Sequence, residues 1–180
     1  MILKKFTSAK GLEIILRKAS EEDAAKIIEF SLLTLKAFEE ITLTAPEEFT
    51  RPIEEQKDWI KLHNLPGSFL ALAQHNSILV GIIHLQSFQK KKIAHCGELA
   101  IAIHPEFTDQ KIGTEMMNCL LEWAKNQNVI EKIILNVNEN NSRAVHIYKK
   151  LGFVQEGHNV KATKQKNGIY NNNIQMAWFK

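Results

Sequence analysis

Three apolar segments joined by short polar turns constrain the fold of this 180-residue chain more than any other feature. Apolar side chains dominate residues 69–74, 78–88 and 93–104, and three or four residues separate each segment from the next. Connections this short can join only antiparallel neighbours, because a parallel strand needs a crossover of about a dozen residues or more. The middle of the chain is therefore predicted to form an antiparallel meander.

The segments on either side of this meander predict a mixed domain. Helix-like and strand-like apolar periods alternate there, with no repeat, low-complexity linker or domain boundary. The predicted order is strand 12–19, a helix capped by Ser20 and Asp23 that runs to about 37, helix 53–64, the meander, helix 111–127, strand 132–138, helix 141–151, and strands 153–163 and 171–179. We therefore expect one domain, residues 1–180, of the α/β (α+β) class with a largely antiparallel sheet.

Charge and composition exclude several classes of partner. The formal net charge is only +3 and the run Lys90–Lys92 falls in a predicted turn, so we expect no nucleic-acid surface. No stretch approaches about eighteen apolar residues and the N-terminus lacks the apolar core of a signal peptide, so we expect no membrane span and a cytoplasmic protein. Cys96 and Cys119 lie far apart without a CxxC partner, which favours buried free thiols over a metal site or a disulfide.

The segment 99–117 has the first pattern that indicates a binding site. A strand ends at Pro105, a short polar loop follows, and a helix begins near Lys111. The first amides of a helix have no intrahelical partner and lie at the positive end of its dipole, so they suit an anion such as a pyrophosphate. Gly113 would let a phosphate approach the backbone closely. Lys111 opposes the dipole unless an anion is bound, although a plain helix start that tolerates a lysine is the alternative.

The segment 138–153 has the second such pattern, on one face of a predicted helix. Asn141 and Tyr148 stand seven residues apart, two helical turns, and so share one face with Ala144 and Val145. The helix then stops at Gly152. A helix face with an amide, two small apolar residues and a phenol is either a polar patch in a core or one wall of a ligand site.

These two segments resemble the GNAT superfamily of acetyl-CoA-dependent N-acetyltransferases, and the resemblance covers nearly the whole chain. In that family a strand ending in V-x-P precedes a loop R/Q-x-x-G-x-G/A; here Ile103-His104-Pro105 precedes residues 108–113. The family's last helix reads N-x-x-A-x-x-x-Y-x-x-x-G-F, and the matching residues are Asn141, Ala144, Tyr148, Gly152 and Phe153.

The loop departs from the family pattern at two positions. Thr108 stands where Arg or Gln is usual, and Lys111 stands where the first Gly is usual. Asp109 also brings a negative charge close to the expected phosphates. The helix-terminal amides are backbone groups and are unaffected by these changes.

The resemblance implies a GNAT-like sheet with helices on both faces and a splay between the fourth and fifth predicted strands, 93–104 and 132–138. Acetyl-CoA is the implied acyl donor, its pantetheine arm paired in the splay with backbone groups of Ile101 and Ile103 and hydrogen-bonded by Asn141. No metal is implied. The residues expected to bind acetyl-CoA are Ile101, Ala102, Ile103, Asp109, Gln110, Lys111, Ile112, Gly113, Thr114, Asn141, Ala144 and Tyr148.

The resemblance also suggests a mechanism. Tyr148 would lie near the thioester sulfur, and a phenol with a pKa near 10 stays protonated at pH 7 and can donate to a leaving thiolate. Glu98 is the candidate base for the amine, directly or through water, with a solvent-facing strand carboxylate as the alternative. His84 is a weaker candidate whose alternative role is structural.

The acceptor is expected to be a primary amine of a small molecule or of a peptide N-terminus. The loop that carries Glu39, Glu40, Glu47 and Glu48 would attract a cationic amine, or is simply a solvated loop. A homodimer is implied by the resemblance only. The alternative function is a non-catalytic acyl-CoA-binding sensor or scaffold on the same fold.

Overall fold

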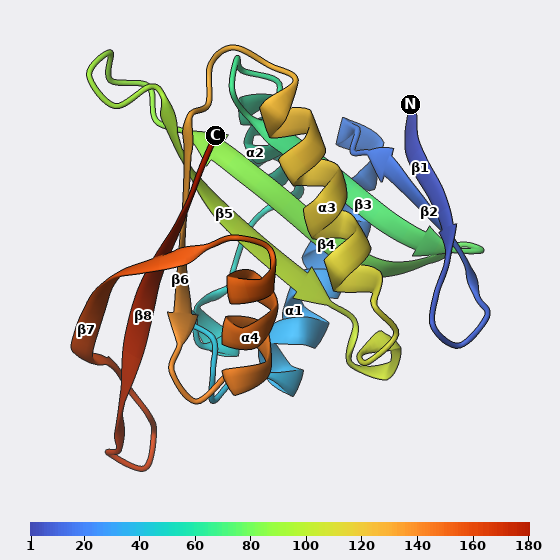
Figure 1. Cartoon of the computed structure of the whole chain (residues 1–180). Coiled ribbons are helices and arrows are strands. Elements are labelled where there is room, and N and C mark those ends of the chain that lie inside the picture. The colour runs from blue at the N-terminus through green and yellow to red at the C-terminus, as the bar shows by residue number, and fades with distance from the viewer.

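The computed structural model describes residues 1–180 and contains one eight-stranded sheet covered by helices (Figure 1). The strands are β1 (Ile2–Thr7), β2 (Glu13–Lys18), β3 (Phe69–His75), β4 (Ile78–Ser87), β5 (Cys96–Ile103), β6 (Lys132–Asn138), β7 (Val154–Lys164) and β8 (Tyr170–Phe179). The helices are α1 (Ala24–Ala37), α2 (Ile53–Leu62), α3 (Ile112–Lys125) and α4 (Ser142–Lys150). The order across the sheet is β1-β2-β3-β4-β5-β6-β8-β7, and only the β5–β6 pair is parallel.

The predicted fold class is confirmed, but the sequence analysis missed the first strand. β1 pairs with β2 alone, with Phe6 opposite Ile14, and none of its residues is buried. Lys4 and Lys5 break its apolar run. An edge strand of this kind needs no buried face, so its sequence lacks the alternation that marks an inner strand.

The predicted cap at Ser20 is confirmed, with a 3₁₀ turn (Glu21–Asp23) placed before α1. The Asp23 carboxylate accepts a hydrogen bond from the backbone N–H of Ser20 at 2.8 Å, as in a capping box. The same carboxylate accepts two hydrogen bonds from the Arg17 guanidinium of β2. Burial alone would raise the pKa of Asp23, but the hydrogen bonds from Arg17 and Ser20 outweigh it and hold the pKa below its usual value.

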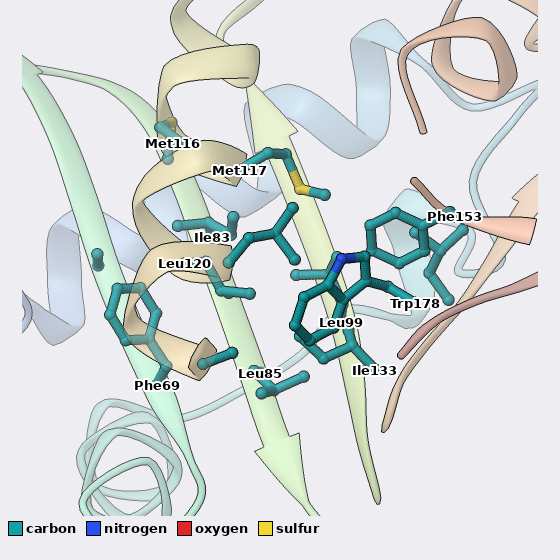
Figure 2. Packing of buried hydrophobic residues seen from close by; sticks show 14 of the residues in the cluster. Phe69, Ile83, Leu85, Leu99, Met116, Met117, Leu120, Ile133, Phe153 and Trp178 are labelled. Atoms are coloured by element: carbon teal, nitrogen blue, oxygen red, sulfur yellow. The ribbon is translucent and has the colours of Figure 1, made fainter. Parts of the chain in front are cut away.

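The helices cover the two faces of the sheet with separate apolar cores. α3 and α4 lie on one face, where Met117 and Leu120 of α3 belong to the larger core together with Leu99 of β5 (Figure 2). α1 and α2 lie on the other face, where Ile27 belongs to a smaller core with Leu72 of β3. The sheet is thus sandwiched between two helical layers, as predicted.

Two further expectations concern the cysteines and the membrane. Both thiols are free, with Cys96 buried and Cys119 only half-buried, so the expectation of buried thiols holds for Cys96 alone. None of the helices is both long and apolar enough to cross a membrane.

β5 and β6 part after three residues, which confirms the predicted splay. Their parallel pairing joins Cys96–Glu98 to Lys132–Ile134 and then ends. Beyond this point β5 stays paired with β4 as far as Ile103, and β6 stays paired with β8 as far as Asn138. Figure 1 shows the two strands diverging, with α4 in front of the gap.

The larger core gives a test of how α3 is held on the sheet. Leu120 is fully buried, so Leu120→Ala should lower the free energy of unfolding by about 2–5 kcal/mol through lost apolar contact and the remaining cavity. The control is Leu43→Ala, at a leucine that is 64% exposed, for which we expect a change within about 0.5 kcal/mol. Urea unfolding curves would measure both, and equal effects would contradict this packing.

Candidate active site

The parted strands leave backbone groups of β5 free at the edge that faces β6. The His104 N–H donates to the Val80 carbonyl, and the Phe88 N–H donates to the Cys96 carbonyl, so the even-numbered residues of β5 bond to β4. The odd-numbered residues therefore direct their N–H and C=O groups towards β6, which is absent beside Ile101 and Ile103. These two residues present the edge that an extended ligand would pair with.

A cavity of about 620 Å³, the splay cavity, lies over this free edge. It is walled by β5, the loop to α3, the first turn of α3, the end of β6, α4 and the C-terminal part of α1. Every residue predicted to bind the cofactor lines it, namely Ile101, Ala102, Ile103, Asp109, Gln110, Lys111, Ile112, Gly113, Thr114, Asn141, Ala144 and Tyr148. The fold thus brings the two sequence motifs together around one space.

The first turn of α3 offers unpaired amides to this cavity. The first helical hydrogen bond runs from the Glu115 N–H to the Lys111 carbonyl at 3.1 Å, and the three amides before Glu115 have no backbone acceptor. Lys111 is the N-cap, with a left-handed backbone at φ +61°. Glycine adopts this conformation without strain, which explains why a glycine suits the position. The strained lysine keeps the turn that presents the amides.

The loop before α3 is fixed by the hairpin that the sequence analysis missed. Gln110 is buried, and its side-chain oxygen accepts a hydrogen bond from the Ser8 hydroxyl at 3.1 Å. Its backbone carbonyl accepts a hydrogen bond from the Ala9 N–H at 3.0 Å. The Gln110 side chain therefore holds the loop against the β1–β2 turn.

The charge of Asp109 at the mouth of the splay cavity is balanced by a residue that the sequence analysis overlooked. Arg143, in the first turn of α4, approaches the Asp109 carboxylate at 3.0 Å, and both side chains are largely exposed. Arg143 and Lys111 both line the cavity, so its mouth carries two cations and one carboxylate. Arg143 falls between motif positions, and only the folded chain brings it beside the loop.

Asn141 is the N-cap of α4. Its side-chain oxygen accepts a hydrogen bond from the Ala144 N–H at 3.2 Å, which satisfies one of the free amides of the helix. The side-chain NH₂ has no partner in the protein. One end of the amide is thus committed to the helix, and the other is available as a donor in the cavity.

Tyr148 lies two turns further along α4, against Phe153 at a ring-centroid distance of 5.7 Å. Its hydroxyl has no hydrogen-bond partner in the protein. Burial raises the pKa of Tyr148 to about 12, because the phenolate would lose its solvation there. The phenol therefore keeps its proton at any pH at which the protein would work.

Glu98 lies outside the splay cavity. It is the last residue of β5 to pair with β6, opposite Ile134, and its side chain is exposed. The Asn136 side chain donates a hydrogen bond to its carboxylate at 3.4 Å. Its role as a base stays a prediction, and from this position Glu98 would act through water.

A second cavity of about 350 Å³, the α1–α2 cavity, lies on the opposite face of the sheet. It is lined by α1, α2, the loop before α2, β4 and β5. It shares Thr34, Ile101 and Ala102 with the splay cavity, so the two spaces meet where β5 leaves β6. No sequence motif marked this cavity, although it contains His84.

His84 lies at the end of a chain of hydrogen bonds that fixes which of its ring nitrogens carries the proton. The Trp59 carbonyl can only accept, so the proton lies on Nδ1 of His63, 2.8 Å away. Nε2 of His63 is then the acceptor for Nδ1–H of His84, at 3.2 Å. This leaves Nε2 of His84 unprotonated and without a partner in the protein. Burial, the neighbouring His63 and the charge of Arg51 lower the pKa of His84 to about 3.

The His84 environment predicts an acid-sensitive fold. The unfolded chain takes up this proton near pH 6.5 and the folded chain near pH 3, so the unfolded state binds more protons between these values. The free energy of unfolding should therefore fall as the pH drops through this window, by up to about 1.4 kcal/mol per pH unit from this group. His63, whose pKa burial also lowers, acts in the same direction.

Urea unfolding between pH 7 and about 4 would measure this dependence. His84→Gln should flatten the curve, whereas His146→Gln, at an exposed histidine of α4, should leave it unchanged. Parallel curves for the wild type and His84→Gln would show that His84 does not carry the effect.

The left-handed backbone at Lys111 gives a second prediction. Lys111→Gly should be about 1 kcal/mol more stable than Lys111→Ala, because only glycine relieves the steric cost of this conformation. The matched control is Lys57, in the middle of α2, where the order should reverse by about 1 kcal/mol because glycine is a poor helix former. Thermal unfolding of the four variants would test both signs, and equal stability at position 111 would contradict the strained turn.

Comparison with known proteins agrees with this architecture. The model of the acetyltransferase (GNAT) family matches residues 34–153, which is two thirds of the chain and includes both motifs. The chain belongs to this family of acyltransferase enzymes. The resemblance seen in the sequence and the fold that it implied are therefore confirmed.

Individual relatives are more distant. The chain is 34% identical to a spermidine N(1)-acetyltransferase of Vibrio cholerae over 49% of either chain, so it spans about half the length of that relative. It is 26% identical to the L-amino acid N-acetyltransferase AaaT of Escherichia coli over 65% of this chain and 72% of the relative. A GNAT-family acetyltransferase of Streptococcus pneumoniae has a similar crystal structure, with a TM-score of 0.86, 25% identity, and coverage of 93% of this chain and 99% of that one.

Proposed function

We propose that this protein transfers an acetyl group from acetyl-CoA to a primary amine of a small molecule or of a peptide N-terminus. The observation that carries the proposal is the free edge of β5, where Ile101 and Ile103 offer unpaired backbone groups to the splay cavity. An extended arm that contains amides, such as pantetheine, can pair with this edge as a strand does. The family assignment supports acetyl-CoA as the donor.

The groups around the splay cavity fit such a donor from one end to the other. The free amides of α3 and the cations Lys111 and Arg143 suit a pyrophosphate at the mouth. The free NH₂ of Asn141 suits a carbonyl of the arm. Bound in this way, the donor would supply an activated acetyl group, and the N–H groups at the free edge would polarise its carbonyl.

Tyr148 is the proposed general acid. Expulsion of a thiolate needs a proton, and the Tyr148 hydroxyl holds one at neutral pH with no competing partner in the protein. Glu98 is retained as the proposed base, acting through water. His84 is too weak a base for this step at neutral pH, since its pKa is about 3.

The names of the relatives point to acceptors of different charge. One curated relative is a spermidine acetyltransferase and another acts on L-amino acids, so the family resemblance leaves the acceptor class open. The second candidate function is a non-catalytic acyl-CoA sensor that uses the same splay cavity, and the position of the proposed base Glu98 outside that cavity favours it.

Tyr148→Phe tests the proposed chemistry. The rate of acetyl transfer should fall by about 100-fold or more, while the dissociation constant for acetyl-CoA changes little, because the phenyl ring keeps the packing and loses only the proton. Calorimetry would give the dissociation constant, and a thiol assay of released CoA would give the rate.

Tyr170→Phe is the matched control, since Tyr170 is the other tyrosine and lies half-exposed in β8, outside both cavities. It should leave both quantities unchanged. Tight acetyl-CoA binding without transfer to any amine would support the sensor instead, and an unaffected rate in Tyr148→Phe would remove the proposed acid.

A further inference from the structure

Arg51 is the one arginine of the chain without a carboxylate partner. Arg17 pairs with Asp23 and Arg143 pairs with Asp109, but no carboxylate lies within ion-pair distance of Arg51. Arg51 lines the α1–α2 cavity and is half-buried, and its guanidinium lies 5.4 Å from the centre of the Phe49 ring and 5.6 Å from that of the Trp59 ring. A partly desolvated guanidinium usually has a carboxylate or phosphate partner.

Gln56 places a second unsatisfied donor in the wall of the same cavity. Its side chain is fully buried, and its oxygen accepts a hydrogen bond from Nη1 of Arg51 at 3.2 Å. This bond fixes the orientation of the amide, which leaves Nε2 buried without an acceptor. A buried donor without a partner costs about 1–3 kcal/mol, so an acceptor supplied by a ligand would stabilise both residues.

No acidic side chain lines the α1–α2 cavity, so Arg51 leaves it positively charged. Of the four nearby glutamates that the sequence suggested for a cationic amine, three have their carboxylates engaged elsewhere. Lys166 pairs with Glu39 at 2.6 Å and with Glu47 at 3.2 Å. The Glu48 carboxylate accepts a hydrogen bond from the backbone N–H of Ala45 at 3.1 Å. A polyamine would therefore meet a cation here and no compensating carboxylate.

The α1–α2 cavity is also placed to deliver an amine to the donor. It meets the splay cavity at Thr34, Ile101 and Ala102, beside the free edge of β5. The unprotonated Nε2 of His84, which lines the α1–α2 cavity, can accept a hydrogen bond from an amine. The apolar walls, which include Phe30, suit the carbon skeleton of a small molecule.

We propose that the α1–α2 cavity binds the acceptor and selects a small primary amine that also carries a carboxylate, held by Arg51 and Gln56. This inference rests on the proposed function, because it names the acceptor class of the same reaction. The acceptor would be an amino acid rather than a polyamine or a simple alkylamine. Arg51 is thus a residue that determines specificity.

Matched acceptor pairs that differ only in the carboxylate test the proposal. We suggest L-leucine with isopentylamine, β-alanine with ethylamine and γ-aminobutyrate with propylamine, and spermidine as the polycation. For at least one pair, kcat/KM should favour the amino acid by about 10- to 100-fold, the discrimination expected when a carboxylate meets a guanidinium. Preference for the alkylamine in every pair, or for spermidine over every amino acid, would overturn the proposal.

Substitutions at Arg51 test whether this residue causes the preference for acceptors that carry a carboxylate. Arg51→Gln should reduce kcat/KM for the amino acid by about 10- to 100-fold and change kcat/KM for the matched alkylamine far less, while Arg51→Lys should restore part of the difference. The control is Lys57→Gln, which removes one positive charge from α2 outside the cavity and should change neither substrate. Unchanged acetyl-CoA affinity would show that each variant is folded.

Calorimetric titration of the CoA-loaded protein with L-leucine, β-alanine and γ-aminobutyrate separates this inference from the proposed function. If no amine is acetylated, the proposed transferase function fails. Binding of one of these amino acids that is lost in Arg51→Gln would then still support the carboxylate site. Absence of such binding, or binding that does not depend on Arg51, would overturn it.

Discussion

The parting of β5 from β6 is the constraint on which the rest of the structure depends. At Ile101 and Ile103 the edge of β5 carries backbone N–H and C=O groups that no neighbouring strand pairs with. The fold keeps this edge open because β4 and β8 hold the two strands from outside, and α4 lies over the gap between them as one wall of the splay cavity. The site therefore offers unpaired backbone groups of β5, with which an extended ligand can form hydrogen bonds.

The same gap joins the two faces of the sheet. A continuous sheet would separate the core under α3 from the core under α1 and α2, because paired strands leave no passage between them. Where β5 has parted from β6, Thr34, Ile101 and Ala102 line both cavities at once. Two substrates can thus enter from opposite faces and meet at one strand, which is the arrangement that direct transfer between them requires.

The sequence predicted those features that depend on local patterns. The meander, α3, α4 and the motif residues of the splay cavity follow from apolar periods and from fixed spacing. β1 was missed because Lys4 and Lys5 hide an edge strand that buries no residue. Arg51 was missed because a loop has no period, and its environment depends on Phe49, Trp59 and Gln56 meeting in space. The exclusion of Glu98 from the splay cavity depends on where pairing ends, and spacing does not encode that position.

The charge of Arg51 also bears on how an acceptor amine becomes reactive. The attacking nitrogen must be neutral, yet an alkylamine with a pKa near 10.4 costs about 4.6 kcal/mol to deprotonate at pH 7. Burial and, to a smaller extent, the charge of Arg51 already lower the pKa of His84 and of His63. An ammonium group in the same cavity would experience the same two effects, and its pKa would fall for the same reason. A guanidinium that binds the carboxylate of an acceptor would therefore also favour the neutral amine, so recognition and activation would depend on a single side chain.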